Sequence, residues 1–390
     1  SYPYDRPAPD PVADLKALLD EFQLADLAVL EKRLDRLRRD VTKPSRTQDA
    51  DKKELAILEQ VNKVMEEKGT LRGMPLRPEE DALIRPYGFL TMKTLLIVLS
   101  LPEGGKSDQA WTATLEGMGY MVISTDFRQE RHNLHTLLQQ KADLVLVCKG
   151  EFIPAELIKS IPYPTALWYC EQIGNDNSID YAAILRRNEL AYNVTAFDYV
   201  FSHDSTNLQI YRDMGCKNVF WLPCVAVNTH IHKKLDVPRK FDVTFVGSQT
   251  PRRKEILIAL EKHVKVFNPN VWEGNKLNEI FNASKIVLNI HLSDLLNTET
   301  RVGEVLGAGS FLLTEELSCR ELFTDGKHLV QWRQGDVEGL VGKIQYYLAN
   351  EDEREKIAEE GHRFAVEHHS FEKRMQQLLA TINFDKQTHV

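Results

Sequence analysis

The chain has few cysteines, and their spacing gives them no shared structural role. Its 390 residues include five cysteines, an odd number, scattered along the chain and never spaced as C-x-x-C. This pattern indicates neither a disulfide framework nor a zinc knuckle, and we expect most of the cysteines to be buried thiols. The sequence also lacks any apolar run near the roughly 20 residues of a membrane span, and its first residues lack the basic and apolar regions of a signal peptide. We therefore expect a cytoplasmic protein.

An excess of positive charge is also absent. The chain has 49 lysines and arginines against 57 aspartates and glutamates, which gives a formal net charge of -8. This balance argues against a general affinity for nucleic acid or for an anionic membrane. With 43% hydrophobic and 27% charged residues, the chain has the composition of a globular protein of two or three domains. Small anions remain possible ligands, because basic residues cluster at 252–254.

Residues 1–91 differ in kind from the rest of the chain. Between residues 14 and 41, apolar side chains recur with the three- and four-residue spacing of a coiled-coil seam. These residues are Leu27, Leu30, Leu34, Leu37 and Val41. A polar break at 42–47 precedes a second helical run that ends at Gly69 and carries Leu58, Val61 and Met65 on one face. The pattern predicts an antiparallel α-helical coiled-coil hairpin.

The amino-acid sequence of this arm resembles that of a known family. The segments that carry it are 10–15, 24–27, 31–34, 77–80 and 89–91. They resemble the coiled-coil arm of the Obg-like ATPases of the YchF type, over about residues 9–99. None of that family's nucleotide-binding motifs is included, so the resemblance implies no ATPase activity. Met92 opens a strand like the start of an independent protein, which suggests a natural or engineered fusion at this point. We expect the arm to mediate dimerisation or partner docking or, if it is engineered, to assist crystallisation.

From Met92 onward, short apolar strands alternate with amphipathic helices. The first series of strands is expected at 94–100, 121–125, 143–148, 165–169, 198–202 and 219–222. After an irregular stretch at 225–240, a second series is expected at 241–247, 264–267, 285–290, 310–314 and 329–332. The alternation predicts the α/β class, with two Rossmann-like domains of parallel strands at 92–230 and 231–390. Ligands of such folds bind at the carboxyl ends of the strands, in the cleft between the domains.

The stretch 300–314 is the strongest indication of function. A short helical segment carries Glu304, ends in small residues that include Gly307 and Gly309, and leads directly into an apolar strand. This order suits a site where a carboxylate holds a ribose while glycines let the backbone and the ligand approach closely. It predicts a nucleotide-sugar site.

Several segments in this half of the chain keep the order of motifs of one known family. They are 245–248, 251–253, 283–291, 301–309, 312–314, 321–323, 346–348 and 361–363, preceded by 197–204 and 215–223. Over about residues 92–380 they resemble the GT-B glycosyltransferases, in particular the branch of CgeB-like spore maturation proteins. The resemblance implies a glycosyltransferase whose first domain takes an unidentified acceptor and whose second binds a nucleotide-diphosphate sugar, expected to be UDP-linked. It implies no metal and no other cofactor.

The departing nucleotide diphosphate needs positive potential, which a GT-B enzyme takes from a helix N-terminus and basic side chains. The loop Gly247-Ser248 leads into a helix with Arg252 and Arg253 in its first turn, where cations oppose the helix dipole. We expect Ser248, with Arg252 or Arg253, to contact phosphate. The alternative is a solvated basic face.

Glu304 is the candidate ribose ligand, and the alternative is a carboxylate on the helix surface. Arg301 either reaches the phosphates or pairs with Glu304 at the three-residue spacing. Many retaining relatives carry a second glutamate eight residues before the ribose carboxylate, where this chain has Leu296. The donor hexose must therefore be contacted by other residues, and the candidates are Asn289, His291, Asp294 and Asn297.

A catalytic base, if the enzyme inverts, should come from the first domain. Glu171 follows the fourth expected strand, and His203 and Asp204 follow the fifth. The alternative for each is a structural hydrogen bond, and Asp204 is well placed to cap a helix. A retaining enzyme needs no such base, and the sequence leaves both outcomes open.

Two competing interpretations remain. In one, the chain is an interaction or scaffold protein that docks through its arm and keeps a non-catalytic nucleotide-sugar-binding domain. In the other it is a P-loop nucleotidase, because segment 100–107 follows a strand, although Ser100 replaces the first glycine of the motif.

Overall fold

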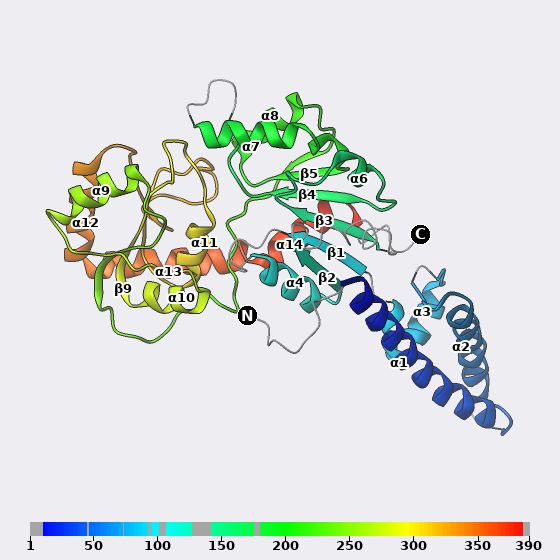
Figure 1. The fold of residues 1–390 in the computed structure, drawn as a ribbon. Helices are drawn as coiled ribbons and strands as arrows, with labels where there is room; N and C mark the ends of the chain where they lie inside the picture. The colour runs from blue at the N-terminus through cyan, green and yellow to red at the C-terminus, as the bar shows by residue number, and fades with distance from the viewer. Residues whose placement is uncertain are drawn as a thin grey trace, which may run out of the picture.

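The computed structural model describes residues 11–44, 47–72, 74–92, 95–100, 107–126, 142–174 and 180–384. Figure 1 shows them as a helical arm, a first α/β unit next to it and a second α/β unit on the far side. Most of the segment considered as a P-loop, residues 101–106, lies outside the described residues.

The arm is built from two long helices, α1 (Pro11–Asp40) and α2 (Gln48–Lys68), and a short one, α3 (Pro78–Ile84). The two long helices pack along one apolar seam because their apolar side chains recur on a single face. The buried residues of this seam are Leu30, Leu34, Leu37, Ile57, Leu58, Val61 and Met65. Gly69 ends α2 with a φ of 67°, a left-handed conformation that glycine adopts without strain.

The base of the arm is fixed to the first α/β unit. Two short 3-10 helices, η1 (Arg85–Tyr87) and η2 (Leu90–Met92), follow α3. The buried Asp26 carboxylate of α1 accepts hydrogen bonds from the backbone N–H groups of Leu90 (2.8 Å) and Thr91 (2.7 Å). Leu19 and Phe22 pack against the core of the first unit. The start of α1 is therefore part of the junction, whereas the far end of the hairpin projects from it (Figure 1).

The first unit is a six-stranded sheet with the order β2-β1-β3-β4-β5-β6, in which every pairing is parallel. Its strands are β1 (Leu95–Ser100), β2 (Met121–Asp126), β3 (Leu144–Cys148), β4 (Thr165–Tyr169), β5 (Tyr199–Ser202) and β6 (Val219–Trp221). The helices and 3-10 turns of this unit are α4 (Ser107–Gly117), α6 (Ala155–Lys159), α7 (Tyr181–Ala191), η3 (Val194–Ala196), η4 (Ser205–Asn207) and α8 (Leu208–Asp213). Alternate residues of β3 and β4 enter two separate apolar cores, as expected for a sheet covered on both faces.

The second unit is a five-stranded parallel sheet with the order β11-β10-β9-β7-β8. Its strands are β7 (Phe241–Phe245), β8 (Val266–Phe267), β9 (Ser284–Asn289), β10 (Leu312–Glu315) and β11 (Val330–Trp332). The helices are α9 (Pro251–Glu261), α10 (Gly274–Asn282), α11 (Thr300–Gly307), α12 (Val337–Ala349) and α13 (Glu351–His368). The α/β class with parallel sheets is therefore confirmed.

The last helix does not belong to the second unit, although we expected residues 231–390 to form one domain. Helix α14 (Phe371–Thr381) crosses back to the first unit, where it lies beside α4 and the first sheet (Figure 1). Five buried side chains of this C-terminal segment share a core with Trp111, Leu144 and Trp168. They are Met375, Leu378, Leu379, Ile382 and Phe384.

The chain thus passes between the two units twice, and the two crossings touch. The N–H of Val227 donates to the His369 carbonyl (2.7 Å), and the N–H of Phe371 donates to the Val227 carbonyl (3.1 Å). These bonds form an isolated parallel bridge between Val227 and Ser370.

Candidate functional site

A cavity of about 440 Å³ lies between the two α/β units. The first unit lines it with Lys149 and Glu171, which follow β3 and β4, and with an apolar group that includes Trp111 and Trp168. Besides Arg253 of α9, the second unit contributes the last residue of β9, residues that follow β7, β8 and β9, and the beginning of α11. These residues are Gly247, Ser248, Trp272, Asn289, Leu292, Asn297, Glu299, Thr300 and Arg301. The cavity therefore lies at the carboxyl ends of both sets of strands, where ligands of parallel sheets bind.

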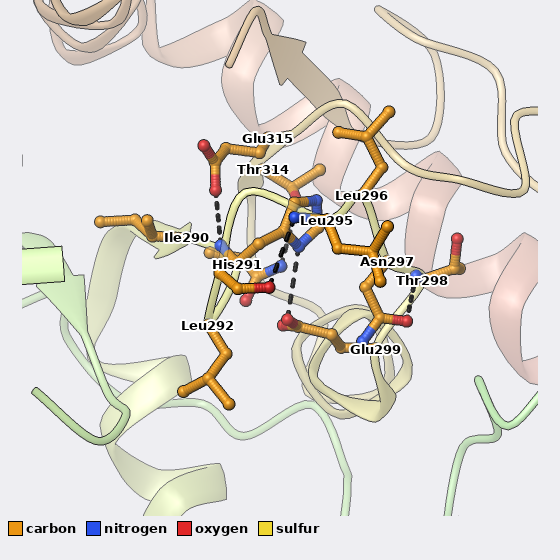
Figure 2. Close-up of polar contacts among 12 residues, drawn as sticks. Ile290, His291, Leu292, Leu295, Leu296, Asn297, Thr298, Glu299, Thr314 and Glu315 are labelled. Carbon is orange, nitrogen blue, oxygen red and sulfur yellow. Dashed lines mark hydrogen bonds and ion pairs between the residues drawn. The ribbon is translucent and has the colours of Figure 1, made fainter. Parts of the chain in front are cut away.

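The N-terminus of α11 opens into this cavity. Glu299 occupies the N-cap position, but its side chain makes no capping hydrogen bond. Figure 2 shows the carboxylate turned instead toward the ring of His291, with 3.3 Å between Oε1 and Nδ1. The first N–H groups of a helix have no partner within the helix, and they carry the positive end of its dipole. The first turn of α11 therefore offers an anion-binding surface on the wall of the cavity.

Glu299 and His291 form a buried ion pair. Burial alone would lower the pKa of His291 and raise that of Glu299, but their hydrogen bond and mutual charge outweigh it. The pKa of His291 is therefore above its ordinary value and that of Glu299 below. His291 Nε2 lies 2.9 Å from the Glu316 carbonyl oxygen, which accepts its hydrogen bond. Of the residues expected to contact a hexose, His291 is thus a support for the cavity wall, whereas Asn289 and Asn297 line the cavity.

Arg252, one of the two arginines that we expected to contact phosphate together with Ser248, is not among the described residues that line the cavity. Its guanidinium makes two bonds to the buried Glu315 carboxylate, at 2.5 and 3.1 Å, and one to Asp294 at 2.6 Å. Glu315 also accepts the backbone N–H of His291 at 2.5 Å (Figure 2). Because a buried carboxylate needs a countercharge, Arg252 is committed to Glu315. Asp294, bound to Arg252, is not among the described residues that line the cavity.

Arg253 does reach the cavity, but its guanidinium holds two loops in place. It donates to the Ile290 carbonyl at 2.6 and 2.9 Å and to the Ser248 carbonyl at 3.1 Å. The loop after β7 is thereby tied to the loop after β9. Gly247 lies close beside it, since a Cβ there would come within 3.0 Å of Arg253 Nη1 and of the Phe245 ring.

Arg301 and Glu304 form an ion pair at 2.6 Å, one of the two arrangements that we expected for Arg301. Arg301 lines the cavity and lies over the Phe281 ring, whereas Glu304 is not among the lining residues. The glycines nearby serve the packing of α11 on the linker between the units. A Cβ on Gly307 would come within 2.6 Å of Val227, and Gly309 has a φ of 69° just after the helix. We expected Gly307 and Gly309 to let the backbone and a ligand approach closely; the structure shows close packing at both glycines, and neither is among the described residues that line the cavity.

The three candidate bases lie in different surroundings. Glu171 lines the cavity and is held by Lys149 (2.8 Å) and, more weakly, Arg186 (3.9 Å). His203 and Asp204 are buried and do not line the cavity. His203 Nε2 contacts Asn297 Oδ1 of the second unit at 3.1 Å.

Asp204 has a structural role. Its carboxylate caps η4 through the N–H of Thr206 (2.9 Å) and also accepts hydrogen bonds from Gln172 (2.5 Å) and from Ser318 of the second unit. These three partners engage the carboxylate, and Asp204 is not among the described residues that line the cavity. Asp204 and His203 instead join the two units behind the cavity.

Several residues of the cavity wall were absent from our sequence candidates, among them Lys149, Trp272 and Glu299. Lys149 follows β3 and has a φ of 65°, an unusual conformation for a residue other than glycine. The rule that ligands gather at strand carboxyl ends could have identified it. Trp272 and Glu299 lie in irregular segments, and no sequence pattern marked them.

Two further observations concern the described part of the chain alone. Among residues 11–384, apart from the gaps given above, no group of three or more His, Cys, Asp or Glu side chains is arranged to hold a metal ion. In the same residues, no helix has both the length and the apolar composition that crossing a membrane requires.

Comparison with known proteins finds a matching family model and solved structures of similar fold. Residues 230–380 match the family model described as glycosyl transferase-like. HepE from Anabaena, solved in complex with UDP-glucose, superposes with a TM-score of 0.57 at 12% identity, over 74% of this chain and 99% of that chain. A sucrose-phosphate synthase from Thermosynechococcus elongatus gives a TM-score of 0.56 at 9% identity, over 75% and 99%.

Curated relatives match smaller portions of the chain. The ribosome-binding ATPase YchF of Escherichia coli O157:H7 is 36% identical over 97 residues at the N-terminus, which are 25% of this chain and 26% of YchF. Uncharacterized protein R358 of Acanthamoeba polyphaga mimivirus is 29% identical over 157 residues, or 40% of this chain and 54% of R358. The chain thus spans about a quarter of the YchF proteins that it matches. Residues 230–380 thus resemble a glycosyl transferase-like domain, and the fold of the chain is similar to that of HepE and of the sucrose-phosphate synthase.

Proposed function

We propose that the chain is a glycosyltransferase that uses a nucleotide-diphosphate sugar as donor, and that it belongs to the CgeB-like branch. The observation that carries the proposal is the uncapped N-terminus of α11 on the wall of a cavity between two parallel sheets. A donor of this kind leaves as a nucleotide diphosphate, so the enzyme must stabilise the negative charge that develops on the departing phosphates. A helix N-terminus aimed at that position does so without reorganisation.

In this proposal the diphosphate lies against Thr300 and Arg301, with Ser248 opposite. Arg301 lines the cavity and is near enough to Glu304 to share its charge between that carboxylate and a phosphate. Arg253 acts indirectly, because it fixes the Ser248 loop. Because these groups neutralise the charge on the phosphates, we expect the reaction to need no metal ion.

The nucleotide extends from the phosphates toward Trp272. This side chain lines the cavity while 50% exposed, and its indole N–H donates to Asn270 Oδ1 at 2.9 Å, which fixes the ring. An ordered, exposed aromatic face at the edge of a ligand cavity is suited to stacking on a nucleobase. Glu304 remains our candidate for the ribose. The UDP-glucose bound by HepE supports a UDP-linked hexose as donor.

The sugar end of the donor then points toward Asn297, Glu299 and Glu171. For an inverting reaction we propose Glu171 as the base. The acceptor hydroxyl loses its proton to Glu171, its oxygen forms the new bond to the anomeric carbon, and the bond from that carbon to the diphosphate breaks. Lys149, 2.8 Å from the carboxylate, holds Glu171 in place before the reaction.

The test is thermal stability in the presence of UDP, GDP, CDP, ADP and dTDP, each with EDTA and with Mg²⁺. A ligand at about 100 times its Kd stabilises the folded state by roughly 2.7 kcal/mol. We expect UDP to raise the Tm in EDTA, and Glu304→Ala to abolish the shift. Glu338→Ala, at an exposed position of α12, is the matched control. No shift with any diphosphate would contradict the proposal, and a shift that requires Mg²⁺ would contradict its metal independence.

Turnover of the donor distinguishes the proposed function from the alternative, an interaction protein with a non-catalytic sugar-nucleotide domain. The observation that favours this alternative is the exposure of two apolar side chains on α1, Leu24 and Val29. UDP binding without release of UDP from UDP-glucose in the presence of acceptors would support that alternative.

A further inference from the structure

A second cavity, of about 250 Å³, lies beside the first. We propose that it binds the acceptor, and that the acceptor is an uncharged sugar ring with a free hydroxyl. This inference rests on the proposed function and adds the class of the second substrate.

The two cavities share a wall. Glu171, Leu292, Asn297 and Glu299 line both of them. Of these, Glu171 belongs to the first unit and the other three to the loop between β9 and α11 of the second. A donor whose phosphates lie on the first turn of α11 places its sugar beside Asn297 and Glu299. A molecule in the second cavity therefore reaches the anomeric carbon across this shared wall, with Glu171 next to its hydroxyl.

The lining of the second cavity suits one sugar ring. Hydroxyl partners are available from Gln172, Ser293 and Asn297 as well as from the carboxylates, while Leu292 and Leu295 offer apolar faces to the C–H groups of a ring. The volume is below the roughly 300–1,000 Å³ of sites for drug-sized ligands, so a single ring fits and a longer glycan must extend outward.

The charges that line the second cavity disfavour an anionic acceptor. Three carboxylates line the cavity, those of Glu171, Asp180 and Glu299, and Arg186 is the cationic side chain among the described residues that line it. The Arg186 guanidinium donates to the Gln172 carbonyl at 3.0 Å and lies 3.9 Å from Glu171. A phosphate or carboxylate on the acceptor would therefore meet negative charge and a guanidinium already in use.

A competing place for an acceptor is the apolar wall of the larger cavity, which includes Trp111, Trp168 and Phe371. That wall would suit an apolar alcohol. A substitution that fills the second cavity alone distinguishes the two places.

Ala182→Trp is such a substitution. Ala182 is exposed on α7, lines the second cavity and does not line the first, so an indole there occupies the second cavity from its rim. Asn188→Trp puts the same side chain on an exposed position of α7 that lines neither cavity, and it serves as the control.

The experiment measures saturation-transfer NMR signals of small sugars on the full chain saturated with UDP. The probes are methyl hexosides, the corresponding hexose 6-phosphates and uronic acids, and octyl alcohol. We expect at least one methyl hexoside to give a signal in the wild type and in Asn188→Trp. In Ala182→Trp the signal of this hexoside should be at least tenfold weaker. The matching phosphate and uronate should give none.

The thermal shift with UDP, measured on all three proteins, keeps the two proposals apart. If UDP binds but no methyl hexoside does, if Ala182→Trp leaves the hexoside signal unchanged, or if the charged sugars bind equally well, the acceptor site is wrong and the donor site stands. Binding of octyl alcohol alone would move the acceptor to the apolar wall. If UDP itself fails to bind the wild type, the proposed function fails first.

Discussion

At the scale of the residue, Glu315 fixes the position of two loops from inside the second sheet. It is fully buried at the end of β10, where it binds Arg252 of α9 and the N–H of His291 after β9. Removing one partner of a buried ion pair typically costs 3–5 kcal/mol. We expect Glu315→Ala to lower the free energy of unfolding by about 3 kcal/mol, measured by urea denaturation. Glu316→Ala removes a more exposed carboxylate and should cost less than about 1 kcal/mol.

Trp272 provides a residue-scale test of how the donor is held. Stacking of a base on an aromatic ring contributes about 1–3 kcal/mol. Trp272→Ala should therefore weaken UDP binding by about tenfold or more, whereas Trp272→Phe should retain most of the affinity. Calorimetric titration with UDP measures both. Equal affinity in the wild type and the alanine variant would place the nucleobase elsewhere in the cavity.

The residue scale is also where prediction from sequence was weakest. Arg252 and Arg253 are adjacent and chemically alike, yet one binds the buried Glu315 and the other two loop carbonyls. Their difference depends on which carboxylate the fold buries nearby, and Glu315 is distant in sequence. Glu299 turns away from its own helix toward His291, so its position also follows from packing.

At the scale of the element, the sequence located the strands well. Runs such as Thr165–Tyr169 must bury both faces in a parallel sheet, and this leaves a continuous apolar signal. The expected strand at 264–267 is shorter in the structure, Val266–Phe267, because it is an edge strand. Helix α14 could not be placed from sequence, since an apolar helical face does not specify which of two cores it covers.

The arm should behave as a separate element. Its apolar seam contains Leu58, which is fully buried, and no described arm residue lines either cavity. Leu58→Ala should destabilise the hairpin by about 2–5 kcal/mol and leave the UDP-induced shift intact. Circular dichroism during urea denaturation, together with the UDP thermal shift, measures both effects. Gln60→Ala, exposed on α2, is the control, and loss of UDP binding in Leu58→Ala would contradict this independence.

The junction between α13 and α14 makes stability depend on pH. Burial, with the Arg374 charge added, lowers the pKa of His369 to about 3. Since the unfolded pKa is about 6.5, the unfolded chain binds more protons between these values, and stability falls as the pH drops below about 6.5. We expect a loss of about 2 kcal/mol from this group between pH 6.5 and 5. In urea denaturation His369→Gln should show a smaller loss over this range, while the half-exposed His368→Gln should match the wild type.

At the scale of the whole molecule, the C-terminal segment connects the two units. Leu378 of α14 is buried in the core of the first unit although its helix follows the second. Leu378→Ala should cost about 2–5 kcal/mol, and the loss should appear in the first unit. Hydrogen exchange of the β3 and β4 amides, compared with those of β9 and β10, locates the effect. Gln376→Ala, on an exposed position of the same helix, should change neither set.

The bridge between Val227 and Ser370 restricts how the two units can move relative to each other. In topological terms the second unit is an insertion within the first, so it is held by two adjacent backbone segments that hydrogen-bond to each other. A body tethered along such a paired line can rotate about it more easily than it can translate or twist. We therefore expect the cavity to open by rotation of the second unit about this line. The contacts of Asn297 to His203 and of Ser318 to Asp204 would hold the two units in the closed position.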